Sequence, residues 1–176
     1  MISNFPAALK LVLQDEGGND DDPADHGGRT SRGITQREYD AWRQLHGHGG
    51  EPAADVWAAS QDEITAIYHD EYWEPYCDSF PVGVDYLYFD MAVNAGPHRA
   101  AVLLQRALGV ADDGRIGPIT KLSASKADPK QLITNYTNSK RAFYISLHQP
   151  KFSKGWLNRC DHVQKSAMAM LPQEAA

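Results

Sequence analysis

The sequence of 176 residues contains only two cysteines, Cys77 and Cys160, and they lie far apart. Two cysteines make neither a disulfide framework nor a four-cysteine zinc site. Free cysteines are commonly buried, so we expect two buried thiols rather than one disulfide.

Long apolar runs are also missing, because none approaches the ~18 residues that cross a bilayer. The first segment, MISNFPAALKLVLQDEGG, has neither the basic start nor the small-residue cleavage site of a signal peptide. We therefore expect synthesis in the cytoplasm without a signal peptide and no stable membrane insertion. Hydrophobic residues make up 42% of the chain and charged residues 23%, which is enough for a packed core in a single domain, 1–176.

Basic residues are scarce in the first part of the chain. Residues 1–100 contain 6 Lys and Arg against 18 Asp and Glu, whereas residues 101–176 contain 11 against 5. Two interpretations stay open: the basic half rests on an anionic surface, or the two halves neutralise each other. The basic residues are scattered singly, so no nucleic-acid-binding module is expected.

Helical periodicity dominates what is present, and it predicts seven or eight helices. Capping boxes at Thr35–Glu38 and Ser60–Glu63 mark two helix starts, and Asp128 followed by Pro129 marks another. The predicted helices run from Pro6 to Glu16, from Gln36 to Gly47, from Gln61 to Pro75, from Val84 to Gly96, from Pro97 to Gly109, from Pro118, from Pro129 to His148, and from about Lys154 to Leu171. Only residues 17–35 leave room for strands, as a small irregular hairpin.

The segment LQDEGGNDDDPADHGGRTSRGIT, residues 13–35, is too acidic and too rich in glycine to form a core. Glu16 ends an apolar helical stripe formed by Phe5, Leu9 and Val12. Burial and the negative end of the helix dipole both favour its protonated form, which suits a general acid. Asp25 lies in a polar loop where water keeps it ionised, and Thr30 offers a hydroxyl that can hold a water. Two carboxyls in such different environments are the pair that cleaves glycosidic bonds.

Three other interpretations apply to this segment and to the nearby histidines. Glu16 before two glycines is often only the last turn of a helix, and an acidic loop is often only solvated. A calcium site is disfavoured because the EF-hand spacing is absent and Pro23 interrupts the acidic run. A zinc site at His26, His46 and His48 lacks helical spacing and a cysteine partner, so we expect no metal and no other cofactor.

Several separate motifs, in order, resemble one family. EGG, then Asp25, then GGRTSRGIT resembles the N-terminal motif of glycoside hydrolase family 108, the phage and bacterial N-acetylmuramidases. It is also similar to the Glu, Asp and Thr arrangement in the lysozymes of T-even phages. The segments YHDEYWEPY, FDMAVNAGPHRAAVLLQRALGVADDGRIGPIT and KGWLNRC resemble later parts of the same family, the second of them its peptidoglycan-binding-type region. The resemblance covers residues 5 to 165.

The resemblance implies a mainly α, lysozyme-like fold, a helical bundle in which a small β-hairpin or loop carries the active site. It implies an N-terminal catalytic lobe at 1–80 and a C-terminal peptidoglycan-binding-type lobe at 81–172. Glu16 matches the catalytic acid, Asp25 the second carboxylate and Thr30 the threonine, with Thr35 as a nearby alternative. The remaining matched positions, expected to contact substrate or turn the chain tightly, are Gly17, Gly18, Gly27, Gly28, Gly33 and Asn94.

The implied function is that of an endolysin-type N-acetylmuramidase, which hydrolyses the β-1,4 bond between N-acetylmuramic acid and N-acetylglucosamine. Its partner would be the peptidoglycan glycan strand, bound by a monomer. The alternatives are a lytic transglycosylase and a non-catalytic module that binds the wall or promotes secretion. We expect action on the cell wall after release from the cytoplasm, through holin pores if the protein is phage-encoded. The DDGRIGPIT stretch has two readings, a peptidoglycan-binding motif or an ordinary turn into a helix, and the second is favoured.

Overall fold

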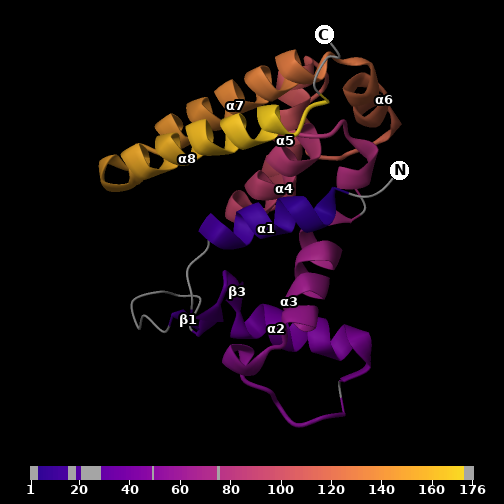
Figure 1. The fold of residues 1–176 in the computed structure, drawn as a ribbon, viewed down its shortest axis with the longest axis vertical. Helices are drawn as coiled ribbons and strands as arrows, with labels where there is room; N and C mark the ends of the chain where they lie inside the picture. The colour runs from indigo at the N-terminus through magenta and orange to yellow at the C-terminus, as the bar shows by residue number, and fades with distance from the viewer. Residues whose placement is uncertain (1–3, 16–18, 21–28, 49, 75, 173–176) are drawn as a thin grey trace. The chain divides into compact units, whose positions relative to one another are not determined.

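The computed structural model describes residues 4–15, 19–20, 29–48, 50–74 and 76–172, and Figure 1 draws them as a ribbon. They form two compact units. The N-terminal unit is Phe5–Glu71, and the C-terminal unit holds the described residues from Tyr72 onward together with Asn4. Each unit is described by itself.

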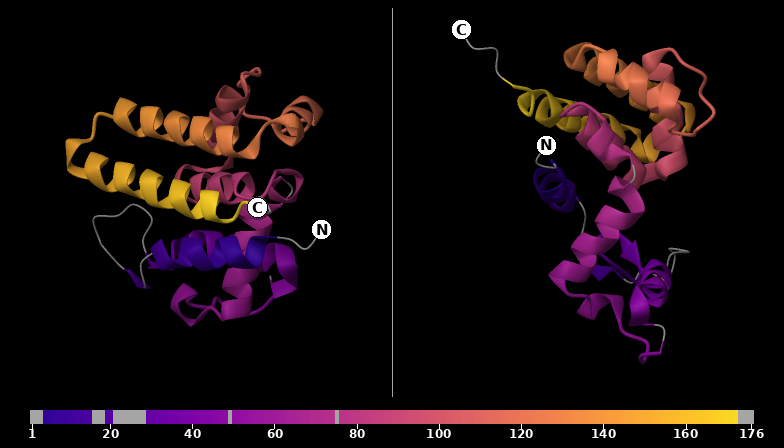
Figure 2. Two further views of the ribbon diagram at one scale, coloured as in Figure 1. Left: turned by 45° about the horizontal axis from the view of Figure 1, so that its top comes forward. Right: turned by 90° about the vertical axis from the view of Figure 1, so that its right-hand side faces the viewer.

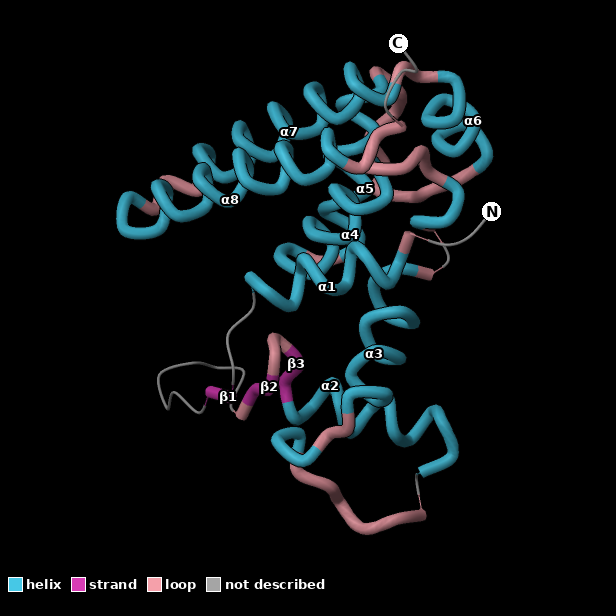
Figure 3. The backbone as a smooth tube through the Cα atoms, in the orientation of Figure 1, coloured by secondary structure: helices cyan, strands magenta, loops and turns pink. Residues whose placement is uncertain are grey.

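The N-terminal unit combines short helices with three very short strands (Figure 3). The helices are α1 (Phe5–Asp15), α2 (Gln36–Arg43), the π-helix η1 (Gln44–His48), the 3-10 helix η2 (Val56–Ala58) and α3 (Gln61–Tyr68). The strands are β1 (Asn19–Asp20), β2 (Thr30–Ser31) and β3 (Ile34–Thr35), antiparallel in the order β1-β2-β3. The π-helix η3 (His69–Trp73) continues α3 into the next unit.

The N-terminal unit buries apolar side chains from each of its α-helices. Phe5, Leu9 and Val12 of α1 are all buried, as their spacing predicts. The other large buried side chains of this unit are Ile34, Tyr39, Trp42, Val56, Ile64, Ile67 and Tyr68. Both predicted capping boxes are confirmed, because Thr35 and Ser60 each exchange hydrogen bonds with the glutamate three residues later.

The C-terminal unit is a bundle of helices (Figure 2). It contains η4 (Cys77–Ser79), α4 (Val84–Ala95), α5 (Pro97–Leu108), α6 (Pro118–Lys126), α7 (Pro129–Ser146) and α8 (Pro150–Ala169). Helices α7 and α8 lie side by side, and α4 packs against α5, α7 and α8. Tyr86, Leu87, Phe89 and Met91 of α4 are completely buried, which makes α4 the central helix of this unit.

One glycine is required where α4 begins. Gly83 has a φ of 85°, and a Cβ at this position would lie 2.6 Å from the carbonyl oxygen of Ala167 on α8. Only glycine combines this backbone conformation with such a close approach. Cys77 and Cys160 are both buried free thiols, as expected, and burial raises the pKa of each thiol.

The predicted mainly helical fold with a small irregular hairpin is confirmed. The largest differences from the predicted boundaries lie at three places, and the other helix ends shift by one or two residues. Helix α2 ends at Arg43 and gives way to η1, which reaches Gly47 with a φ of 90°. Helix α3 ends at Tyr68 and continues as the π-helix η3. The last helix begins at Pro150 rather than Lys154, since proline fits the first turn of a helix.

The predicted division of a single domain into lobes at 1–80 and 81–172 stays a prediction. None of the described helices is both long enough and apolar enough to cross a membrane.

Candidate active site

The two predicted catalytic carboxylates, Glu16 and Asp25, lie outside the described residues, as do Gly17, Gly18, Gly27 and Gly28. Helix α1 ends at Asp15, one residue before Glu16. The described part of the predicted site therefore consists of Thr30, Gly33 and Asn94.

Thr30 lies on β2, in the middle of the small sheet. It pairs with Asp20 of β1 on one side and with Thr35 of β3 on the other. The next residue, Ser31, is buried and pairs with the equally buried Ile34. The alternation of side chains along a strand therefore directs Thr30 and Ser31 to opposite faces of the sheet.

A two-residue turn fixes the register of β2 and β3. Arg32 and Gly33 both have positive φ, at 51° and 81°. This is the combination that a tight hairpin of the I′ type requires, and a glycine at the second position supports it. Gly33 thus lies at the tip of the hairpin that carries Thr30.

The hydroxyl group of Thr35 belongs to the capping box of α2. The Thr35 hydroxyl donates to Glu38 Oε2 at 2.8 Å and accepts from the Glu38 backbone N–H at 3.2 Å. The Thr35 backbone N–H donates to the same carboxylate at 2.8 Å. Thr35 is therefore committed to capping α2.

A network around Trp57 anchors the Thr30 strand. The indole N–H of Trp57 donates to the Thr30 carbonyl oxygen at 2.9 Å. The Arg29 guanidinium lies 3.9 Å from the centroid of the Trp57 ring and pairs with Asp55 at 2.6 Å. Asp55 in turn accepts the backbone N–H of Trp57 at 3.0 Å, which caps η2.

The hairpin turn has a second anchor in α3. The Tyr68 hydroxyl donates to the Arg32 carbonyl oxygen at 2.5 Å, and Tyr68 is itself buried in the core of the N-terminal unit. The Arg32 guanidinium donates to Gln61 at 3.1 Å. The sequence alone did not indicate Trp57, Asp55 or Tyr68, because their contacts join residues 26 to 36 positions apart in the chain without a repeating pattern.

Two histidines of the disfavoured zinc site, His46 and His48, have separate partners. His46 pairs with Asp70 at 3.2 Å and stacks on Trp42, while His48 pairs with Glu51 at 3.0 Å. Burial raises the pKa of Asp70, but hydrogen bonds from Trp42 and His69 outweigh it and hold that pKa below its usual range. His26 lies outside the described residues.

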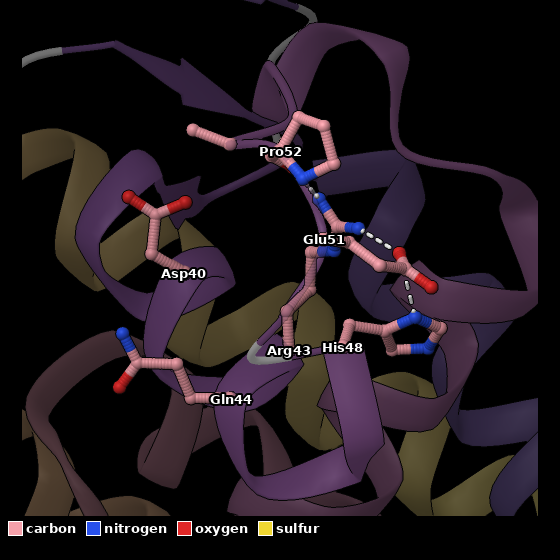
Figure 4. A pocket seen from close by; sticks show the side chains of 7 residues that line it. Asp40, Arg43, Gln44, His48, Glu51 and Pro52 are labelled. Carbon is pink, nitrogen blue, oxygen red and sulfur yellow. Dashed lines mark hydrogen bonds and ion pairs between the residues drawn. The ribbon is translucent and has the colours of Figure 1, made fainter.

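A polar pocket of about 220 Å³ lies at the end of α2 (Figure 4). The Glu51 carboxylate lies between the Arg43 guanidinium, 2.6 Å away, and the His48 ring, as Figure 4 shows. The hydrogen bond from His48 is the main reason that the pKa of Glu51 is lowered. Thr30, Gly33 and Asn94, the predicted site residues that the structure describes, do not line this pocket.

Asn94 is exposed near the end of α4, and its amide donates to the Asp90 carbonyl oxygen at 2.7 Å. It belongs to the C-terminal unit, whereas Thr30 and Gly33 belong to the N-terminal unit. That Asn94 contacts the substrate stays a prediction.

The DDGRIGPIT stretch is organised by one buried side chain, Gln105. Its amide donates to Asp113 at 2.8 Å and to the Arg115 carbonyl at 3.0 Å, and it accepts the Gly114 N–H at 2.8 Å. The stretch lines a pocket of about 290 Å³ and leads into α6. The aspartate and glycines thus build a turn, as their residue types indicate.

Comparison with known proteins identifies the class of protein. Residues 9–96 match the family model described as Glycosyl hydrolase 108, and residues 99–161 match the model described as predicted peptidoglycan domain. The first match contains the hairpin with Thr30, and the second runs from the first turn of α5 through α6 and α7 into α8. The chain is thus placed among the glycosyl hydrolases.

A solved structure supports the same assignment over the whole chain. The structure of Brucella abortus SagA is similar with 33% sequence identity and a TM-score of 0.80, and the match covers 98% of each chain. No match was found among curated proteins. The chain belongs to the glycosyl hydrolase 108 family, with a C-terminal predicted peptidoglycan domain.

The family match and the packing divide the chain at different points. The first family match ends at residue 96, between α4 and α5, yet α4 and α5 pack together within the C-terminal unit. Helix α4 therefore belongs to the hydrolase segment by sequence and to the peptidoglycan-domain bundle by packing.

Proposed function

We propose that this protein is an N-acetylmuramidase that hydrolyses the β-1,4 bond between N-acetylmuramic acid and N-acetylglucosamine in peptidoglycan. One observation carries the proposal. The motif EGG, Asp25 and GGRTSRGIT lies within the segment that matches the glycosyl hydrolase family, and the hairpin holds its threonine on a doubly anchored strand. The adjoining predicted peptidoglycan domain supports the choice of substrate.

In this proposal Glu16 protonates the leaving glycosidic oxygen. Its position directly after α1 suits this role, because the negative end of the helix dipole favours a protonated carboxyl group. Asp25 remains ionised and activates the attacking water as a general base. An inverting displacement of this kind needs the two carboxyl groups to lie about 6.5–9.5 Å apart.

Thr30 would hold the water for attack. The alternative, Thr35, has its hydroxyl occupied by the α2 cap, which favours Thr30 for this role. The anchors from Trp57 and Tyr68 limit the movement of the hairpin backbone, and a fixed hydroxyl orients water better than a mobile one.

Two measurements test the proposal together. Glu16→Gln should abolish the clearing of cell-wall suspensions while the circular dichroism spectrum stays unchanged, because the amide cannot donate the required proton. Mass spectrometry of wild-type digests should show muropeptides with reducing ends. Anhydro-muramic ends would identify a lytic transglycosylase instead, and full activity of Glu16→Gln would refute the assignment of the acid.

The second alternative is a module that binds the wall without turnover. It predicts that the wild-type protein binds purified sacculi and releases no fragments from them.

For the muramidase we propose action on the cell wall after release from the cytoplasm, either as a phage endolysin passing holin pores or from a bacterial secretion locus.

A further inference from the structure

Exposed apolar side chains gather at the turn between α7 and α8. We call residues 145–158 the α7–α8 tip. Ile145, Leu147 and Phe152 are 57%, 40% and 47% exposed. They are three of the eight large hydrophobic side chains exposed among the described residues, and they lie within eight positions of one another. Such clustering on a protein surface marks an interaction site more often than scattered exposure does.

The tip is hollowed by an open groove of about 630 Å³. Its apolar lining comes from Ile145, Pro150 and Leu157, and its polar rim includes Lys154 and His148. Figures 1 and 2 show that the turn lies at the end of the α7–α8 hairpin away from α6, so the tip projects from its own bundle.

The exposed ring of Phe152 is held in place by other aromatic rings. Phe152 stacks on Trp156 with ring centroids 5.7 Å apart, and Trp156 stacks on Tyr144 at 5.2 Å. Tyr144 is buried in the bundle. The row of three rings therefore ties the exposed Phe152 to the core of the C-terminal unit.

Within the tip, residues 145–158, the lysines Lys151 and Lys154 face no Asp or Glu of the same segment. Residues 129–160 contain six Lys and Arg and no Asp or Glu. Lys140 and Arg159 pair with Asp90, and Arg141 pairs with Asp161.

The two lysines of the tip, Lys151 and Lys154, form no ion pair with any residue that the structure describes. Lys151 lies over the Phe152 ring, with its Nζ 5.1 Å from the centroid. Uncompensated positive charge thus lies directly beside the exposed apolar side chains.

We propose that the α7–α8 tip docks on the surface of a bilayer that contains anionic phospholipid. Leu147 and Phe152 would enter the boundary between headgroups and acyl chains, and Lys151 and Lys154 would contact lipid phosphates. This combination is the one used by proteins that lie on a membrane, where apolar burial and attraction to anionic headgroups act together. An anionic wall polymer would match the lysines but offers no apolar phase for the exposed side chains.

The docking is peripheral and goes beyond the hydrolytic function. It would hold the protein at the membrane that borders the peptidoglycan. The chain carries a net charge of −6, so the attraction must act locally within about a Debye length of the tip, roughly 8 Å at physiological salt.

The test is co-sedimentation of the full chain with vesicles. We expect binding to vesicles of phosphatidylcholine with phosphatidylglycerol, weaker binding at high salt, and much weaker binding to phosphatidylcholine alone. Lys151→Gln with Lys154→Gln should weaken binding about 25-fold, taking about fivefold for each lysine. Leu147→Ser with Phe152→Ser should weaken it at least about tenfold.

Helix α6 offers matched controls with the same residue types. Ile119 and Leu122 are 73% and 55% exposed, and Lys121 and Lys126 lie beside them. Ile119→Ser with Leu122→Ser, and Lys121→Gln with Lys126→Gln, should leave vesicle binding unchanged. Equal losses in these controls would overturn the assignment to the tip.

Three further outcomes would overturn the proposal. The first is equal binding to both kinds of vesicle, and the second is full binding by the tip variants. The third is that the wild-type protein binds purified sacculi but no vesicles and that the tip variants lose the binding to sacculi, which would assign the surface to the wall. The vesicles contain no peptidoglycan, so failure of the muramidase proposal would leave this test unaffected.

Discussion

Lys140 of α7 pairs with Asp90 of α4 at a distance of 2.5 Å, and both side chains are at most 2% exposed. Arg159 of α8 reaches the other oxygen of Asp90 at 2.9 Å. Burial alone would raise the pKa of Asp90, but the two cations together hold it below its usual range. Three helices of the C-terminal unit thus meet at one carboxylate.

Removing Asp90 should destabilise the protein strongly. Asp90→Asn leaves Lys140 buried without a counter-ion, and breaking a buried pair in this way costs about 3–5 kcal/mol. The free energy of unfolding, measured by urea denaturation of the full chain, should fall by this order. Lys140→Met combined with Asp90→Asn should be less damaging than Asp90→Asn alone, and Lys165→Met, an exposed position on α8, should have little effect. A wild-type stability of Asp90→Asn would contradict the role of this cluster.

Asp85 should make stability depend on pH in the range between pH 4 and 6. Burial raises the pKa of Asp85 to about 6, and hydrogen bonds from the Tyr86 N–H, Asn4 and the Gly83 N–H only partly offset this. The folded-state pKa of Asp85 lies above its unfolded value of 3.8, so the protonated side chain contributes to stability. This contribution is complete below pH 3.8 and is lost as the pH rises through about 6.

Asp85→Asn should therefore remove a decline on the order of 2–3 kcal/mol between pH 4 and pH 7. The measurement is urea denaturation at a series of pH values. Glu71→Gln, which changes an exposed carboxylate, is the control and should keep the wild-type profile. An unchanged profile in Asp85→Asn would show that Asp85 is not the group responsible.

Thr30 and Thr35 should respond in opposite ways to loss of the hydroxyl group. Thr30→Val should lower kcat on peptidoglycan by about 10- to 100-fold, since a misplaced water costs this much, with little change in stability. Thr35→Ala should lower the free energy of unfolding by about 1 kcal/mol through loss of the α2 cap, and kcat should remain near wild type. Turbidity assays and urea denaturation of both variants give the comparison. The reverse result would move the water-holding role to Thr35.

Trp57 should act on activity through the position of Thr30. Trp57→Phe keeps a ring beneath Arg29 but removes the N–H that donates to the Thr30 carbonyl. We expect kcat to fall about 2- to 10-fold, the effect of one hydrogen bond, with KM nearly unchanged. Leu45→Ala, at an exposed residue of the same unit, should match the wild type. A change confined to KM would instead make Trp57 a direct contact of the substrate.

The helices were predictable because their signals are local. The capping boxes at Thr35 and Ser60, Asp128 before Pro129, and the apolar spacing of Phe5, Leu9 and Val12 each act within a few residues. Boundaries were less predictable where a helix changes type. In η1 the backbone of His46 and Gly47 leaves helical angles, and η3 is a π-helix, whose wider turn an apolar period of 3.6 residues does not predict.

The site was predictable only as a motif. The resemblance singled out Glu16, Asp25 and Thr30 without the contacts that support them. The partners that anchor the Thr30 strand, Trp57 and Tyr68, come from segments that folding alone brings together.

By itself the sequence determined the helical class, the places where most helices begin, the confinement of strands to the glycine-rich acidic segment, and the family motif. These follow from dihedral preferences, capping and periodicity, which act between near neighbours in the chain. Only the tertiary structure decided that Asp90, Lys140 and Arg159 meet, and that Trp57 and Tyr68 hold the hairpin that carries Thr30. Those relationships join residues whose separation in the chain follows no period, so they arise only when the helices pack.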